Sequence, residues 1–349
     1  IFLMAGVSNR GSIFGQAIAG ANDKLRDHGL ILSAAMYGDV ALIASSLTYV
    51  NEEHRLIWGG GLFNDIRSRI DRSFQRSDDL WFVSWERFFG AEALARYPFT
   101  RFSFLQGSIA AGGSEYFLLD DTRKALARPG SEDPSSHNLY APWLANNADL
   151  RFQTEGSLSL GYDTIGMHRA TGPIRGSSAL LSLSVGTQPW HHMTYEQVRL
   201  DAEHYFPITG AVNFFVRGGA GTTSGDSHAP SYFLSSFHTL RGVPFGDTDY
   251  LLGREFVYTT FELQFPILEF LSFPLIDLEG VLGADVGSVA DSVESLWRRR
   301  LLDLVFGTNL GFGPIVIAIH FAQPVDIGPV PTPNGGSLTF NLSLNWRYQ

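Results

Sequence analysis

One arginine and four carboxylates in the last third of the chain are the residues whose types and spacing suggest a specific interaction. Arg241 lies in the run Leu240-Arg241-Gly242-Val243, where the glycine permits a tight turn beside the guanidinium. The carboxylates follow at alternating positions of two later segments: Glu262, Asp277, Glu279 and Asp285. A guanidinium can pair bidentately with a carboxylate. We expect Arg241 to pin a loop through such a pair, although an ordinary salt bridge or a solvated acidic wall remain alternatives.

Other candidates for chemistry are weaker. His191, His192 and His204 could suggest a metal site, but no carboxylate stands at ligand spacing from them. The glycines at 59–61 indicate a strand kink rather than a phosphate-binding turn, because no helix follows them. The motifs G-x-S-x-G and H-E-x-x-H do not occur. We therefore expect no enzyme, no metal and no cofactor.

The composition favours a protein made of many β-strands. The chain of 349 residues is 44% hydrophobic and only 17% charged, with 37 glycines, 27 phenylalanines and 12 tyrosines. No run reaches 18 consecutive apolar residues, so no transmembrane helix is expected. The net charge of −10 argues against a nucleic-acid partner, and the absence of cysteine excludes disulfides. Composition alone does not separate a large soluble β-sandwich from a membrane barrel.

The last segment has the clearest pattern of a membrane-spanning strand. Its even positions carry large apolar side chains, and its odd positions are small or polar over residues 337–347. The apolar positions are Phe340, Leu342, Leu344, Trp346 and Tyr348, preceded by Leu338. This strict alternation predicts a strand with one apolar and one wet face. Its twelve residues suit a tilted crossing of a bilayer, for which about 9–11 are needed.

The same rhythm predicts sixteen strands. They are 1–9, 11–21, 28–37, 40–50, 54–64, 80–90, 98–112, 147–163, 176–186, 193–206, 210–221, 254–266, 275–286, 301–312, 314–323 and 337–348. Long connections follow odd-numbered strands, which is typical of outer-membrane barrels with long extracellular loops and short periplasmic turns. We expect one antiparallel barrel domain over 1–349, with the loop 222–253 folded into the lumen. Aromatic residues near strand ends should form girdles: Trp58, Trp81, Trp85, Phe88, Phe89, Trp190, Trp346 and Tyr348.

At this point the chain resembles the superfamily of BamA and the two-partner-secretion transporters, the "bacterial surface antigen" barrels. The resemblance rests on the run 240–243, on Glu262-Leu263-Gln264-Phe265-Pro266 and on Asp285-Val286-Gly287, and it covers residues 210–349. In that family the arginine loop is the sixth extracellular loop, between strands eleven and twelve of sixteen. Our strand count places it at the same position.

The resemblance implies roles for the residues singled out above. Arg241 would be the arginine at the loop tip, Asp285 its first partner and Glu262 the second, ahead of Glu279 and Asp277. No polypeptide-transport (POTRA) domain is expected within the chain. The implied location is the bacterial outer membrane, with lipids and lipopolysaccharide as surroundings and periplasmic or outer-membrane proteins as partners.

Three functions follow as hypotheses. The first is help with the insertion or translocation of proteins or lipids, through a weak seam between the first and last strands. The second is a structural outer-membrane anchor, or a subunit of a larger envelope complex, without transport activity. The third is a passive diffusion pore, which would conduct steadily in a planar bilayer.

Overall fold

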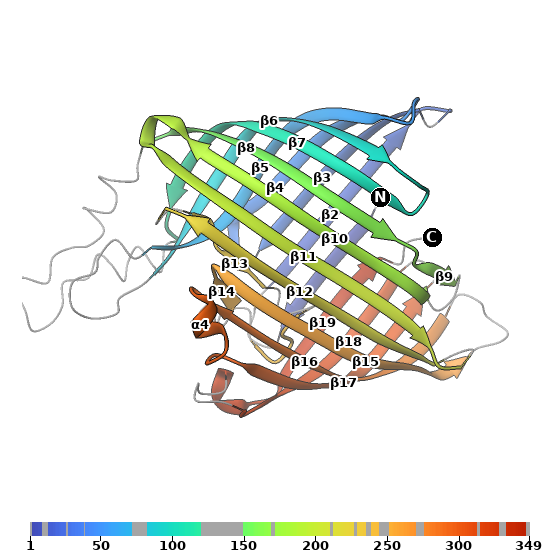
Figure 1. Cartoon of the computed structure of the whole chain (residues 1–349). Helices are drawn as coiled ribbons and strands as arrows, with labels where there is room; N and C mark the ends of the chain where they lie inside the picture. Colours follow the sequence, from blue (N-terminus) through green and yellow to red (C-terminus); the bar gives the residue numbers. More distant parts are fainter. Residues whose placement is uncertain are drawn as a thin grey trace, which may run out of the picture.

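The structure is a computed structural model that describes residues 2–8, 13–25, 27–37, 39–71, 82–119, 149–168, 172–209, 212–226, 229–234, 239–243, 251–269, 276–312, 315–327 and 333–346. It is almost entirely β-structure (Figure 1). The first nine strands are β1 (Phe2–Ser8), β2 (Ile13–Asn22), β3 (His28–Tyr37), β4 (Asp39–Asn51), β5 (Ile57–Asp71), β6 (Phe82–Pro98), β7 (Ser103–Phe117), β8 (Arg151–Asp163) and β9 (Gly166–His168). The others are β10 (Gly172–Gln188), β11 (Met193–Pro207), β12 (Asn213–Gly225), β13 (Tyr232–Phe233), β14 (Leu252–Gly253), β15 (Glu255–Glu269), β16 (Ile276–Ala290), β17 (Leu301–Phe312), β18 (Ile315–Val325) and β19 (Thr339–Trp346).

The main sheet closes on itself. It has seventeen strands within the described residues, and each pairs antiparallel with its neighbour along the ring. The three-residue β9 is only a side branch on the start of β10, which leaves a ring of sixteen strands. The ring closes where β1 pairs with both β2 and β19. The predicted sixteen-stranded antiparallel barrel is therefore confirmed.

The barrel is apolar outside and polar inside, as strand β8 illustrates. Leu158, Leu160 and Tyr162 point outward and are 47–50% exposed, although they are large and apolar. On the opposite face Arg151 and Gln153 are at most 4% exposed. A soluble sandwich buries its apolar face, whereas a barrel in lipid exposes it. This arrangement excludes the soluble alternative that composition left open.

The strand boundaries correct the prediction most at β5 and β6, while other ends, such as the C-terminal ends of β7 and β12, lie five and four residues later than predicted. Residues 65–71, expected as the start of a long loop, continue β5, and residues 91–97, expected as a turn, continue β6 to Pro98. In β6, charged lumen-facing residues such as Glu92 and Arg96 alternate with small outward alanines, so the sequence there lacks the large apolar side chains that mark a membrane strand. Phe88 also does not belong to a girdle: it is fully buried in the lumen against Phe63, whereas Trp58 and Trp190 are exposed as predicted.

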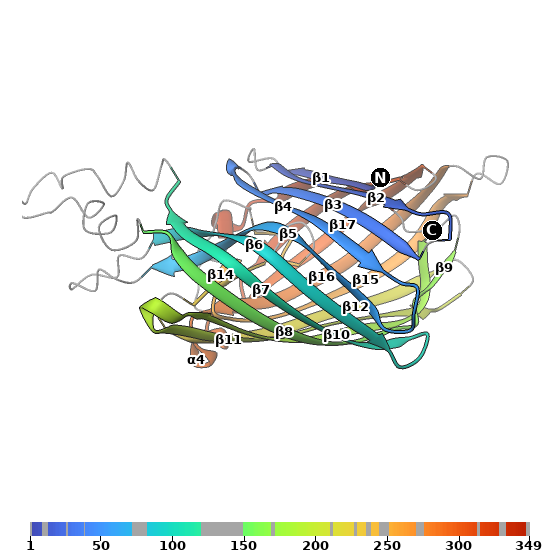
Figure 2. The ribbon, with the colours of Figure 1, turned by 90° about the horizontal axis from the view of Figure 1, so that it is seen from above.

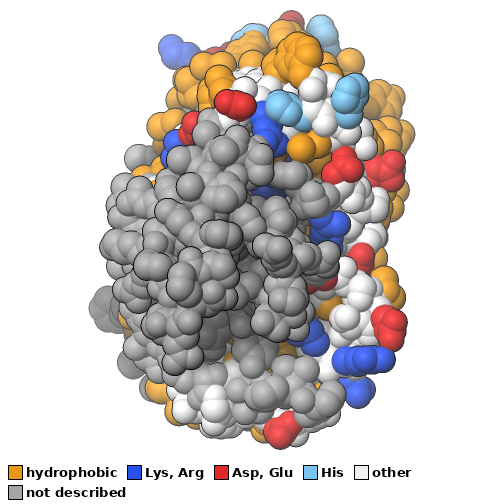
Figure 3. Space-filling model, turned by 90° about the vertical axis from the view of Figure 1, so that its left-hand side faces the viewer, with side chains coloured by type: hydrophobic (Ala, Val, Ile, Leu, Met, Phe, Trp, Pro, Cys, Tyr) orange, Lys and Arg blue, Asp and Glu red, His pale blue; other side chains and the backbone are white. Residues whose placement is uncertain are grey.

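The two ends of the barrel differ. Connections of ten residues or more, including 118–150, 226–254 and 326–338, leave one end, which we call the loop end. Short turns such as 99–102 lie at the other, where both chain termini are found (Figures 1 and 2). Viewed onto the loop end, charged side chains of both signs are scattered along the rim and hydrophobic ones along the outer edge (Figure 3). In the described part of the chain, the helices are too short and insufficiently apolar to cross a membrane.

Candidate functional site

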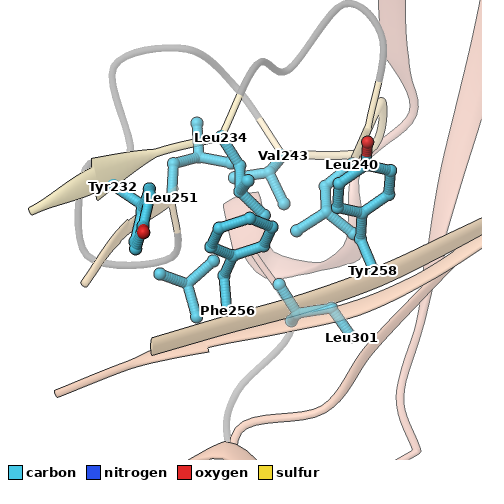
Figure 4. Close-up of a cluster of buried hydrophobic side chains, with 9 residues drawn as sticks. Tyr232, Leu234, Leu240, Val243, Leu251, Phe256, Tyr258 and Leu301 are labelled. Carbon is cyan, nitrogen blue, oxygen red and sulfur yellow. The ribbon is translucent and has the colours of Figure 1, made fainter. Parts of the chain in front are cut away.

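The connection between β12 and β15 forms a hydrophobic cluster with the inner wall of the barrel. Its short strands β13 and β14 pair with each other. The loop contributes Tyr232, Leu234, Leu240, Val243 and Leu251, and the wall contributes Phe256, Tyr258, Val289 and Leu301 (Figure 4). Each of these side chains is at most 9% exposed. The apolar contacts therefore hold the loop inside the lumen, against β15, β16 and β17.

Arg241 is the centre of the polar part of this contact. Its Nε and Nη2 donate to the two carboxylate oxygens of Asp285, at 2.8 and 2.7 Å. Its Nη1 donates to Glu262 Oε1 at 2.5 Å. Arg241 is 3% exposed and Asp285 is 0% exposed. The guanidinium thus forms a bidentate pair with one carboxylate and a single bond with a second, away from bulk water.

The backbone around Arg241 is also fixed. Asn341 Nδ2 on β19 donates to the carbonyl of Arg241 at 2.8 Å, and Thr339 Oγ1 donates to the carbonyl of Gly242 at 3.0 Å. The amide of Gly242 donates to Asp303 Oδ2 on β17 at 2.9 Å. A Cβ atom at position 242 would lie 2.2 Å from Asp303 Oδ1, so any other residue would displace the Asp303 carboxylate. The loop tip is therefore bound to β17 and β19 as well as to β15 and β16, which belong to one continuous stretch of the barrel wall.

The charges of the cluster reinforce one another. Burial alone would lower the pKa of the Arg241 guanidinium, but the Glu262 and Asp285 carboxylates outweigh it and raise that pKa above its ordinary value. Gln264 Nε2 donates to the second oxygen of Glu262 at 3.0 Å. His320 Nδ1 lies 3.5 Å from Arg241 Nη1, and its Nε2 lies 3.1 Å from Asn309 Oδ1. The arginine thus keeps its charge, and both carboxylate oxygens of each of its partners, Asp285 and Glu262, accept a hydrogen bond.

The structure does not bring all predicted partners together. Glu279 lies on the same face of β16 as Asp285 but six residues away, roughly 20 Å along the strand. The side chain of Asp277 lies outside the described residues. Leu240 of the loop packs over Gly287 of β16. A Cβ atom at position 287 would lie 2.8 Å from Leu240 Cδ2, so the glycine two residues after Asp285 leaves room for the loop.

The last strand contributes to the site through its polar face. Phe340, Leu342 and Leu344 alternate with the more deeply buried Thr339, Asn341 and Ser343. The side chain of Trp346 and all of Tyr348 lie outside the described residues. Sequence reasoning missed Asp303, Asn341 and Thr339 as loop contacts. Their position on the polar face of an alternating strand was the only available signal.

The described residues contain no group of three or more histidine, cysteine or acidic side chains close enough to hold a metal ion. His204 instead lies 2.6 Å from Ser177 Oγ. His191 and His192 lie in the turn between β10 and β11, at the loop end. The Arg241 cluster itself consists of one guanidinium paired with the carboxylates of Asp285 and Glu262.

No family model and no curated protein matches the chain. Among solved structures, it is similar to BamA from Haemophilus ducreyi lacking POTRA domains 1–3, with a TM-score of 0.66, 15% identity, and coverage of 99% of this chain and 69% of that chain. It is also similar to CdiB from Acinetobacter baumannii, with a TM-score of 0.61, 11% identity and coverage of 99% and 59%. For CdiB from Escherichia coli the values are 0.57, 11%, 98% and 62%. The chain thus spans about three fifths of the CdiB chains.

These likenesses concern the fold, since the identities are low. The predicted resemblance to the BamA and two-partner-secretion barrels is confirmed at that level. The molecule has the fold of an outer-membrane β-barrel, as expected from its strand pattern.

Proposed function

We propose that this barrel acts in the outer membrane by helping polypeptides or lipids to insert or to cross, through transient opening of the seam between β1 and β19. The observation that carries the proposal is the shortness of that seam. Among the described residues, ladder pairs of this seam run only from Ala5 opposite Leu344 to Ser8 opposite Asn341. On its other side β19 pairs with β18 from Thr339 to Trp346. A shorter ladder has fewer backbone hydrogen bonds to break, so it opens first.

The Arg241 loop supports a particular direction of opening. Asn341 and Thr339 bind the loop backbone from β19, and the loop is bound in turn to β16 and β17. Strand β19 is thereby braced from inside the lumen. Opening would then move β1 away from a fixed β19, and the mechanism needs no bond-making chemistry.

The proposal is tested by the insertion of an unfolded outer-membrane client into vesicles that contain the purified protein. Arg241→Ala leaves Asp285 and Glu262 buried without their cation, which costs about 3–5 kcal/mol of stability. We expect slower client insertion and easier unfolding. Arg298→Ala is the matched control, because Arg298 is exposed at the loop end and pairs only with Glu294 in the described part. Unchanged stability and unchanged insertion in Arg241→Ala would contradict the proposal.

A second candidate is a structural anchor within a larger envelope complex, without transport. It is favoured by the extent of the apolar cluster that holds the loop in the lumen. A loop held so firmly blocks the lumen, which suits a barrel that anchors a complex better than one that must open during transport. The candidates differ in what co-purifies from native membranes. A stable protein partner, together with no effect on client insertion, would support the anchor.

A further inference from the structure

A cavity of about 380 Å³ lies in the lumen, between the β12–β15 loop and the wall formed by β5, β6, β10 and β11. Its lining residues on β10 and β11 lie near the turn 189–192, which joins these strands at the loop end. The volume falls within the roughly 300–1,000 Å³ of small-ligand sites. Arg241, Asp285 and Glu262 do not line it, so the cavity is separate from the ion-pair cluster described above.

Part of the cavity lining is aromatic. Trp85 of β6 and Tyr232 and Phe233 of β13 contribute rings to it. Tyr232 is fixed in place, because its hydroxyl bonds to the backbone carbonyls of Val198 and Thr222, at 2.9 and 3.2 Å. Trp85 and Phe233 are only half-buried, so part of each ring is available for contact. The face of an aromatic ring is negative and attracts groups with a positive edge, such as the C–H bonds of a sugar ring.

Hydroxyl and amide groups form a second part of the lining. Ser182 and Ser184 belong to β10, Gln197 to β11 and Ser231 to the loop. Gln197 donates from Nε2 to Thr223 Oγ1 at 3.0 Å, so its amide oxygen remains able to accept a further bond. Ser231 is buried, and its Oγ has no hydrogen-bond partner among the described residues. A buried polar group without a partner costs free energy, which a hydroxyl-bearing ligand would recover.

The charged residues at the cavity neutralise one another. Arg67 pairs with Asp65 and Glu155, at 2.7 and 2.5 Å, and Arg199 pairs with Asp201 at 2.5 Å. These two guanidiniums and three carboxylates leave no excess positive charge for an anion, and each carboxylate already has a cationic partner. A charged ligand would therefore displace an existing pair, whereas a neutral ligand would not. Arg199 uses Nε and Nη2 for Asp201, which leaves its Nη1 to donate to a ligand.

From this combination we propose that the cavity binds a neutral mono- or disaccharide. The C–H face of a sugar ring packs on Trp85, and the sugar hydroxyls bond to Ser231, Ser184 and Gln197. A hydroxyl both donates and accepts, which suits serine and amide partners. An acyl chain would leave the Ser231 hydroxyl without a partner, and an acidic sugar would meet paired carboxylates without gaining a free cation. The inference is independent of the proposed function, since it does not involve the seam between β1 and β19.

The test uses the full chain, purified in detergent and incubated with a panel of free neutral, amino and acidic mono- and disaccharides and of tripeptides. Native mass spectrometry identifies which of them bind, and calorimetric titration measures the Kd. We expect a neutral saccharide to bind saturably, with one molecule per chain, and more tightly than its acidic counterpart. A panel in which no neutral saccharide binds, or in which acidic sugars or tripeptides bind more tightly, would overturn the proposal.

Two variants test the cavity itself. Trp85→Ala should weaken binding of the tightest neutral saccharide about tenfold through loss of the ring contact. Ser231→Ala should weaken it about fivefold through loss of one hydrogen bond, without lowering the urea midpoint, because its Oγ has no partner among the described residues. The matched controls are Trp190→Ala, exposed at the same end but outside the cavity, and Ser177→Ala, toward the other end of β10. Unchanged affinity in both cavity variants, or loss of binding in Trp190→Ala alone, would also overturn the proposal.

Discussion

Gly242 shows how a single residue determines whether the loop tip can dock. Its amide binds Asp303, and a Cβ atom would overlap that carboxylate. We expect Gly242→Ala to lower the free energy of unfolding by about 1–3 kcal/mol, the range for overpacking a filled site. The matched control is Gly156→Ala on β8, where an added Cβ meets no atom within 4 Å. Urea titration of both variants in the same detergent measures the difference, and equal midpoints would show that the loop tip tolerates a side chain.

The residue scale also shows what the sequence could predict about the site. Arg241, Asp285 and Glu262 were identifiable because an arginine beside glycine preceded carboxylates on the polar face of alternating strands. Asp303 and Asn341 were not, because a polar residue on a lumen face is ordinary in a barrel. Their importance depends on where the loop tip lies, and that is set by the apolar cluster rather than by local spacing.

Among the elements, the seam is where we expect motion. Val7 pairs with Leu342 across it, whereas Ile319 pairs with the same Leu342 on the other side of β19. Paired antiparallel residues have Cα separations of about 4.5–5.5 Å, which suit a disulfide. We expect Val7→Cys with Leu342→Cys to stop client insertion when oxidised and to recover on reduction. The pair Ile319→Cys with Leu342→Cys should insert clients normally, and equal activity of the two oxidised proteins would argue against a moving seam.

Strand boundaries were predictable where one face of the strand contacts lipid and the other the lumen, because the side chains then alternate between apolar and polar. Strands β3 and β17 begin and end where the alternation does. Strands β5 and β6 were predicted too short, β5 at the loop end and β6 at the opposite end, because charged residues on their lumen faces interrupt the apolar pattern there. Arg67 and Arg69 on β5, for example, lie in the lumen beside Glu155 and Glu86. Charge at such positions resembles a loop in the sequence, although the backbone remains a strand.

At the scale of the whole molecule, the β12–β15 loop and two cavities divide the lumen. The loop packs on β15, β16 and β17 and also reaches β5, where the amide of Ser231 donates to the carbonyl of Ser68 at 3.0 Å. One cavity, of about 380 Å³, lies between this loop and β5, β10 and β11, and another, of about 350 Å³, is lined by β2 to β8. Both cavities are lined by Asp65 and Arg67, and Arg67 Nη1 also donates to the hydroxyl of Tyr195 on β11 at 2.7 Å. This cluster reaches across the lumen between β5 and β11. The closure of the sheet into a barrel was predictable from the even number of strands. The arrangement of the loop, the cavities and the Arg67 cluster inside the lumen was not, because it depends on contacts between strands that are distant in the sequence.

These contacts predict the electrical behaviour of the barrel. A lumen that is occupied by a pinned loop and crossed by the Arg67 cluster should pass little current in a planar bilayer. Arg241→Ala removes the cation that pairs Asp285 and Glu262, so the loop should leave the lumen intermittently and produce discrete openings. Those openings should select cations, because the carboxylates then lack their partner. Reversal potentials in a salt gradient measure this selectivity, with Arg298→Ala as the silent control. Steady conductance of the unmodified protein would instead favour a diffusion pore, since a pinned loop and an open pore cannot occupy the same lumen.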